Sequence, residues 1–257
     1  MNDLPPAPPE ASPPLSLGAR FTGVFVTPGE VFDSLKTAPP SVANWLVPAL
    51  LFLVVSWLGA TLMFRNPAIQ RQIQEVQEQA IQKQVASGKI TQQQADQITQ
   101  MTGKYADIGA KIGGYGAPVI MGFASPFFWG FLLWLAGVIY KRPFGYMQGV
   151  EAVGLSNLLS VLEAVAHWLL VAAMSNMFVS LSPALFLKDV DPTSLSFGIL
   201  SSLSVIGLWC LAVRAIALSR LSGLSLMKSA VWVFGMWFLF LSLGLGMGQL
   251  GKLVGGG

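Results

Sequence analysis

Five long apolar stretches constrain the fold of this 257-residue chain more than any other feature of its sequence. They span residues 45–64, 118–140, 150–181, 195–218 and 229–250. A helix needs about 20 residues to cross the hydrocarbon core of a bilayer, and each stretch is long enough to do so. Only 11% of the residues are charged, against about a quarter in a soluble domain, so the chain has too little polar surface to fold in water. The sequence therefore predicts an all-α, polytopic membrane bundle of five transmembrane helices.

The composition also excludes most catalytic and metal-binding classes. A single cysteine, Cys210, and a single histidine, His167, cannot build a disulfide framework or a metal cluster of thiolates and imidazoles. The chain contains neither a G-x-S-x-G nor an H-E-x-x-H motif. Its net charge of +3 is small and spread along the chain, which argues against a nucleic-acid partner. We therefore expect a non-enzymatic protein without a cofactor or metal, in contact with the lipid bilayer.

Four segments follow from the distribution of these residue types. They are a proline-rich, disordered cytoplasmic tail at 1–26, a short surface helix with the first span at 27–64, a polar connection at 65–116, and spans two to five at 117–257. In the short helix, Thr27, Pro28 and Glu30 match a capping box. This helix either lies amphipathically at the membrane surface or is a capped linker.

The connection at 65–116 is rich in glutamine and has helical periodicity. Thr91 and Gln94 match a second capping box, and Ser87 and Gly88 interrupt the pattern. We predict two antiparallel helices that turn near residues 87–90 and pair along an apolar seam, as an extracytoplasmic hairpin. This hairpin is either a structural stalk or a surface for a protein partner or for self-association. The seam residues are Ile69, Ile73, Val76 and Ala80 on one helix and Ile98, Met101, Tyr105, Ile108 and Ile112 on the other.

Basic residues in the short links predict the orientation. Lys141 and Arg142 lie between spans two and three, and Arg220 and Lys228 lie around the link between spans four and five. The positive-inside rule places these links in the cytoplasm. The N-terminus is then cytoplasmic and the C-terminus extracytoplasmic, as expected for a multi-pass protein of a bacterial inner membrane. The same four side chains are candidate contacts for lipid headgroups.

The third span carries most of the polar residues. Ser156, Ser160, Glu163 and His167 recur at spacings of four, three and four, so they share one helix face. A charge at the bilayer centre costs about 2.5 to 3.5 kcal/mol, so Glu163 needs a partner, and His167 is the nearest one in sequence. The pair either lines a hydrated cavity that handles protons or a cation, or it is satisfied inside the bundle and fixes its packing. We favour packing, because no second acid lies within another span.

Two further contacts between helices are predicted. Glu151 starts the third span and Arg214 ends the fourth at a similar depth, so we expect a salt bridge between them. Alternatively, Arg214 joins the basic loop residues in binding lipid headgroups. Gly244 and Gly248 form a G-x-x-x-G pair, which predicts close packing within the bundle in preference to packing between copies.

Three blocks of the sequence resemble the Yip-one domain family of membrane proteins. Residues 27–35, TPGEVFDSL, resemble the family's proline and phenylalanine segment before the first span. Residues 144–163 resemble its aromatic turn entering a span rich in small residues. Residues 209–232 resemble its closing pattern, a basic loop followed by serine, lysine and alanine entering the last span. The resemblance covers about 27–64 and 118–250, and with the long hairpin it is closest to the bacterial branch of the family.

This resemblance implies a five-span helical bundle with a cytosolic N-terminus and an opposite C-terminus. It also implies a role in membrane organisation, since eukaryotic members take part in vesicle trafficking and bind prenylated Rab-type GTPases and one another. The present chain lacks the family's acidic, tyrosine, glycine and proline segment before the first span, which argues against GTPase binding. The family supplies no catalytic residues.

Two functional hypotheses follow from the sequence. The first is a non-enzymatic interaction or membrane-organising protein that uses the hairpin and the basic links. The second is a small transporter or channel subunit that uses the polar face of the third span. A polar cavity that reaches Glu163 favours the second hypothesis, whereas a dry, packed bundle favours the first.

Overall fold

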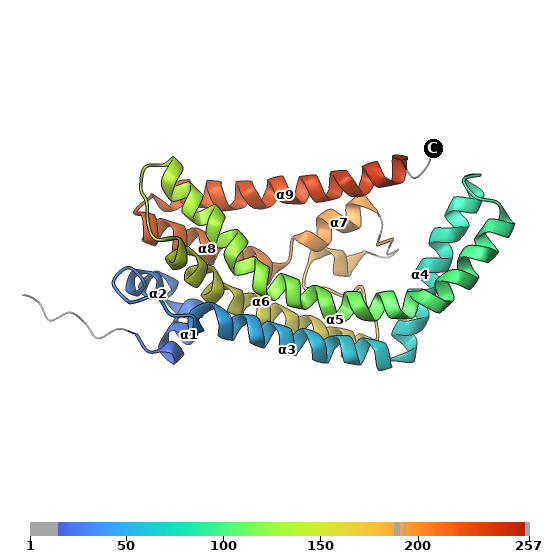
Figure 1. Ribbon diagram of the computed structural model, residues 1–257, viewed down its shortest axis with the longest axis horizontal. Coiled ribbons are helices and arrows are strands. Elements are labelled where there is room, and N and C mark those ends of the chain that lie inside the picture. The colour runs from blue at the N-terminus through green and yellow to red at the C-terminus, as the bar shows by residue number, and fades with distance from the viewer. Residues whose placement is uncertain (1–14, 188–190, 193, 255–257) are drawn as a thin grey trace, which may run out of the picture.

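The computed structural model describes residues 15–187, 191–192 and 194–254, and this part of the chain is helical and contains no strand. In chain order the elements are α1 (Leu17–Val26), α2 (Pro28–Ser34), α3 (Ala43–Arg65), α4 (Pro67–Ala86), α5 (Gln92–Ile139), α6 (Tyr146–Met174), the short 3₁₀ helix η1 (Pro183–Phe186), α7 (Leu195–Ser202), α8 (Val205–Ser222) and α9 (Leu226–Val254). The longest helices run along the long axis of the molecule (Figure 1). The predicted all-α fold is confirmed.

Five of these helices are long and apolar enough to cross a membrane. They are α3, the Ile108–Ile139 part of α5, α6, α8 and the Leu226–Gln249 part of α9. The predicted number of spans is therefore confirmed, and the chain is a multi-pass membrane protein. Helices α3, α5, α6 and α8 pack against one another, whereas α9 packs mainly against α8 and is almost unburied along its apolar part.

Two of the predicted spans have different limits in the structure. The third span was predicted over 150–181, but α6 ends at Met174, where Ser175 adopts a left-handed conformation with φ of 48°. The fourth was predicted as one helix over 195–218, but it is broken into α7 and α8. The hydroxyl of Ser204 caps α8 by accepting a hydrogen bond from the Gly207 N–H at 3.3 Å. Hydropathy missed this break because both pieces are apolar.

The N-terminal helices differ from the prediction in two respects. Residues 1–14 of the predicted tail lie outside the described residues, but Leu17–Val26 forms α1, so the prediction of disorder up to residue 26 is wrong. Helix α2 begins at Pro28 as expected, yet Thr27 makes no side-chain cap, so the first capping box is also wrong. The Thr27 N–H instead donates to the Gly23 carbonyl at 2.7 Å, which joins the end of α1 to the start of α2.

Both N-terminal helices form because their apolar residues enter the main core. Val24 of α1 and Val31 and Phe32 of α2 are fully buried and pack with residues of α6 and α8. Helix α2 is therefore part of the bundle, and its apolar side contacts protein, not the membrane surface. Figure 1 shows α1 and α2 together at one end of the molecule.

The predicted hairpin is formed by α4 and the first part of α5, and it projects from the end opposite α1 and α2 (Figure 1). Gly88, with φ of 72°, lies in the turn, and the capping box of Thr91 and Gln94 is present as predicted. Helix α5 then continues without a break for 48 residues to Ile139. The second arm of the hairpin is thus a rigid extension of the second span.

The predicted seam within the hairpin is only partly formed. Ile69 is fully buried, but it packs with Val171 of α6 and with Val179 in the segment after α6, not with α5. Ile108 and Ile112 are more than half exposed. Met101 and Tyr105 lie outside the described side chains. The hairpin therefore keeps apolar surface that its two helices do not cover.

Glycines decide where helices approach closely. A Cβ atom at Gly154 of α6 would meet the backbone of Trp45 and, at 2.8 Å, the Asn44 carbonyl oxygen of α3. By contrast, nothing lies within 4 Å of a Cβ built at Gly244 or Gly248 of α9. The predicted packing of this G-x-x-x-G pair within the bundle is therefore wrong, because the face of α9 that carries the two glycines meets no other described helix.

Candidate intramembrane cavity

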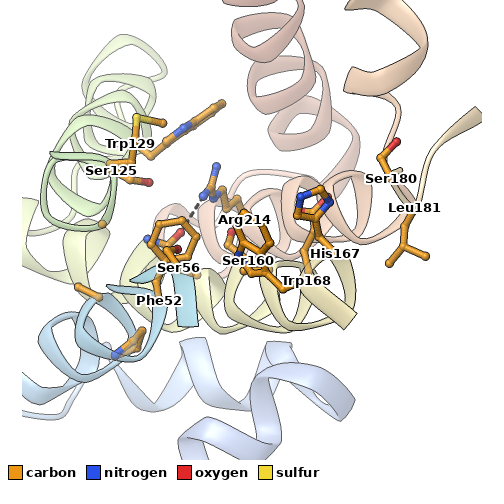
Figure 2. Close-up of a pocket in the computed structure, with 17 residues that line it drawn as sticks. Phe52, Ser56, Ser125, Trp129, Ser160, His167, Trp168, Ser180, Leu181 and Arg214 are labelled. Atoms are coloured by element: carbon orange, nitrogen blue, oxygen red, sulfur yellow. Dashed lines mark hydrogen bonds between the residues drawn. The ribbon is translucent and has the colours of Figure 1, made fainter. Parts of the chain in front are cut away.

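A cavity of about 550 Å³ lies between the spans. Its wall is formed by α3, α5, α6 and α8 together with the segment after α6, and it is mainly apolar. Figure 2 shows Arg214 of α8 projecting between Trp129 of α5 and Phe52 of α3, with His167 of α6 further along the cavity toward Leu181. The spans thus border a partly open space large enough for a small ligand, with ionisable groups in its wall.

Three of the four residues predicted to share a polar face of the third span line this cavity. Ser160, Glu163 and His167 do so, but Ser156 does not. Ser156 is fully buried, and its hydroxyl donates back to the Ala152 carbonyl at 2.7 Å. Asn157 takes its place in the cavity wall. The predicted face is therefore correct except at Ser156, whose carbonyl lies beside Cys210 of α8.

Glu163 is hydrogen-bonded at the break between α7 and α8. The Ser204 hydroxyl donates to its carboxylate, and Gly207 in the first turn of α8 lies beside the same group. The N-terminus of a helix carries partial positive charge, so this is a favourable position for a carboxylate. A partner in another helix, 41 residues away in sequence, therefore takes the role that we assigned to His167.

His167 lies one turn further along α6 and makes different contacts from those predicted. Its ring packs edge-on against the Trp168 indole, with ring centroids 4.9 Å apart. It also interacts with the backbone of Val179 and, electrostatically, with Glu163. His167 is thus a neighbour of the carboxylate and part of the cavity wall, but no direct hydrogen bond between the two side chains is formed among the described residues.

Arg214 is the cation of the cavity. Because the fourth span is α8, Val205–Ser222, Arg214 lies near its middle and not at its end as predicted. Its Nη2 donates to Asn157 Oδ1 at 2.8 Å, and its guanidinium carbon lies 4.7 Å from the centroid of the Trp129 ring. Its Nε is buried without a hydrogen-bond partner. A desolvated cation–π contact with tryptophan contributes about 2 kcal/mol, which is less than the usual cost of a buried, unpaired charge.

The predicted salt bridge between Glu151 and Arg214 is not formed. Glu151 is 2% exposed and accepts a hydrogen bond from Asn44 Nδ2 at 2.5 Å. Asn44 Oδ1 in turn accepts from Arg20 Nη1 at 3.4 Å. A buried network therefore links α1, α3 and α6. Glu151 is connected to Arg20 through the Asn44 side chain, and sequence spacing alone could not predict this connection.

The four candidate lipid-contacting residues are all exposed. Lys141 and Arg142 lie in the link between α5 and α6, and Arg220 and Lys228 lie at the adjacent ends of α8 and α9. Arg220 also donates to Asp33 of α2 at 3.1 Å. These residues lie at the end of the bundle that carries α1 and α2, away from the cavity (Figure 1).

Sequence reasoning missed Ser204, Asn44 and the position of Arg214 inside a span. The serines at 201, 202 and 204 were the available signal for Ser204, because serine is a preferred N-cap and this cluster interrupts an apolar stretch. Asn44 stood just before the first predicted span and was not considered. No local sequence signal gives the position of Arg214 along its span, since that position depends on the residue at which α8 begins.

The fold and the cavity define a class: a multi-pass helical membrane protein with a mainly apolar cavity, lined by a few ionisable side chains, between its spans. Comparison with models of known protein families, with curated proteins and with solved structures finds no match.

Proposed function

We propose that this protein is a non-enzymatic transporter or channel subunit that handles protons or a small cation at Glu163, within the cavity between its spans. The observation that carries the proposal is the cavity of about 550 Å³, which reaches Glu163 and His167 inside the membrane-spanning bundle. Ionisable residues inside a membrane usually mark a pathway for ions or substrates. Because this cavity reaches Glu163, we place the transporter hypothesis ahead of the membrane-organising one.

The break between α7 and α8 supports the same function. Transporters commonly place ion sites at helix ends that lie within the membrane protein and point at the site. Here the N-terminus of α8 and its capping Ser204 contact the Glu163 carboxylate. A change in the protonation of Glu163 then alters a contact that holds α8 to α6, which couples proton binding to the geometry of the cavity.

The test is proton flux in liposomes that contain the purified full-length chain and a pH-sensitive dye. An imposed pH gradient is expected to decay faster than in protein-free liposomes, and Glu163→Gln is expected to abolish the difference, because glutamine cannot exchange a proton. Glu75→Gln is the matched control, since Glu75 is exposed on α4 and does not line the cavity. A wild-type rate equal to that of empty liposomes, or an unchanged rate in Glu163→Gln, contradicts the proposal.

A second candidate is a membrane-organising protein related to the Yip-one domain family, in a bacterial inner membrane. Its support is that the three blocks behind the resemblance contact one another. Gln148 Nε2 donates to the Leu35 carbonyl at 3.1 Å, and Arg220 pairs with Asp33. Affinity purification from membranes, with and without residues 66–115, tests whether the hairpin recruits a partner. Identical sets of partners argue against this role for the hairpin.

For either function we propose a cytoplasmic N-terminus. The basic links and the α1/α2 pair lie at one end of the bundle and the hairpin at the other, which supports the orientation derived from the positive-inside rule (Figure 1). Reporter tags fused to the two termini should report opposite compartments, and a report from the same compartment contradicts this topology.

A further inference from the structure

The Arg214 guanidinium is a buried positive charge without a direct acidic partner among the described residues. Arginine stays protonated in proteins, so it cannot escape burial by losing its proton. The residue is only 7% exposed, and Asn157 is the one side chain in the described part of the chain that accepts a hydrogen bond from it. None of the salt bridges in that part includes Arg214.

The nearby acids are engaged elsewhere. The Glu151 carboxylate accepts from Asn44, and the Glu163 carboxylate accepts from Ser204 at the start of α8. The Nε of Arg214 remains buried and without a partner. A polar side chain more than nine-tenths buried in a cavity wall, with an unused N–H group, indicates that the cavity accepts a hydrogen-bond acceptor of negative charge.

We propose that Arg214 binds an oxyanionic group, a phosphate or a carboxylate, of the ligand that enters this cavity. The inference rests on the proposed function in its proton-handling form, and it names an anion as the substrate that moves together with the proton of Glu163. A guanidinium offers several N–H groups in a planar fork that matches such oxygens. Asn157 uses its oxygen for Arg214, which leaves its NH₂ group as a donor, and the hydroxyls of Ser56 and Ser125 line the same space.

The apolar part of the cavity wall suits the uncharged part of a ligand whose oxyanion binds Arg214. Phe52 and Trp168 contribute large apolar surfaces to the cavity, and the Trp129 ring lies against the guanidinium in a cation–π contact. The oxyanion can therefore belong to a membrane lipid, with its chain leaving along the apolar wall, or to a small water-soluble anion. The two sources share the same contact with Arg214 and are separated by the experiment.

The experiment uses the full-length chain purified in dodecyl maltoside, a detergent without an anionic oxygen group. The soluble probes are inorganic phosphate and acetate, and the lipid probes are phosphatidylglycerol and oleate. Each is titrated while the unfolding temperature is followed by tryptophan fluorescence, since a ligand that binds only the native state raises it. At least one probe should stabilise the wild type, and Arg214→Gln should weaken its affinity by about tenfold to a hundredfold.

Two variants separate binding from folding. Arg71→Gln removes an exposed arginine of α4 that neither lines the cavity nor belongs to the candidate lipid contacts, and it should bind like the wild type. Ser125→Leu keeps the guanidinium, occupies part of the cavity and should also weaken binding. Without any probe, Arg214→Gln should be at least as stable as the wild type, because it removes an unpaired buried charge. A purely structural arginine predicts the opposite, a loss of stability with and without the probes.

The outcomes are distinguishable from those of the flux experiment. Stabilisation by phosphate or acetate alone assigns the site to a soluble anion, and stabilisation by the lipids alone assigns it to a lipid headgroup. If none of the four probes stabilises the wild type, or if Arg214→Gln binds them with unchanged affinity, the anion site is refuted. The proposed function then still stands where proton flux depends on Glu163.

Discussion

Replacement of Gly154 by alanine is expected to destabilise the bundle by about 3 kcal/mol, the upper end of the usual cost of overpacking. The added methyl group collides with the backbone of Trp45 and with the Asn44 carbonyl oxygen, and neither can move without displacing α3. Helices α3 and α6 make the most extensive contact in the molecule, so their separation affects the whole bundle. Reversible unfolding in mixed detergent micelles measures the change in the free energy of unfolding.

Gly244→Ala is the matched control for this prediction. Nothing lies within 4 Å of a Cβ atom at Gly244, so the substitution costs no packing energy. Alanine is also a better helix former than glycine, by up to about 1 kcal/mol, so the expected change is zero or slightly stabilising. Equal effects of the two substitutions would show that Gly154 does not set the distance between α3 and α6.

Glu151→Ala is expected to destabilise the protein by about 3 kcal/mol, because removal of one partner leaves other buried polar groups unsatisfied. Asn44 is fully buried and loses the acceptor for its amide, and Arg20 loses the carboxylate that balances its charge through Asn44. Glu151→Gln keeps a hydrogen-bond acceptor and should cost less. The same unfolding measurement applies to both variants.

Asp33→Ala is the matched control among the acids. Asp33 pairs with Lys36 at 2.6 Å and with Arg220 at 3.1 Å, but these side chains are 40–53% exposed. Exposed ion pairs contribute about 1 kcal/mol or less, so this variant should be nearly as stable as the wild type. Reversing both charges at Glu151 and Arg214 should not restore stability, because the two residues do not pair. Restoration would contradict the network described here.

The polar residues of the spans show which properties can be predicted from the sequence and which cannot. Glu163 was recognised as a residue that needs a partner, because the cost of an unpaired charge in lipid is a local property of its span. Its partner was missed, because Ser204 belongs to a stretch whose hydropathy conceals the end of one helix and the start of another. Arg214 was misplaced for the same reason, since a shift in the limits of α8 moves it from the end of a span to the middle.

The five spans and the helical hairpin could be predicted from the sequence alone, because the spans are surrounded by lipid. Each spanning helix must satisfy its own backbone hydrogen bonds and present apolar side chains over a known length, and both conditions act on consecutive residues. Only the tertiary structure decided which side chains meet. The deciding contacts join segments far apart in the chain: Asn44 with Glu151, Ser204 with Glu163, and Arg214 with Trp129. They depend on the rotation and crossing angles of the helices, which the periodicity within one helix does not specify.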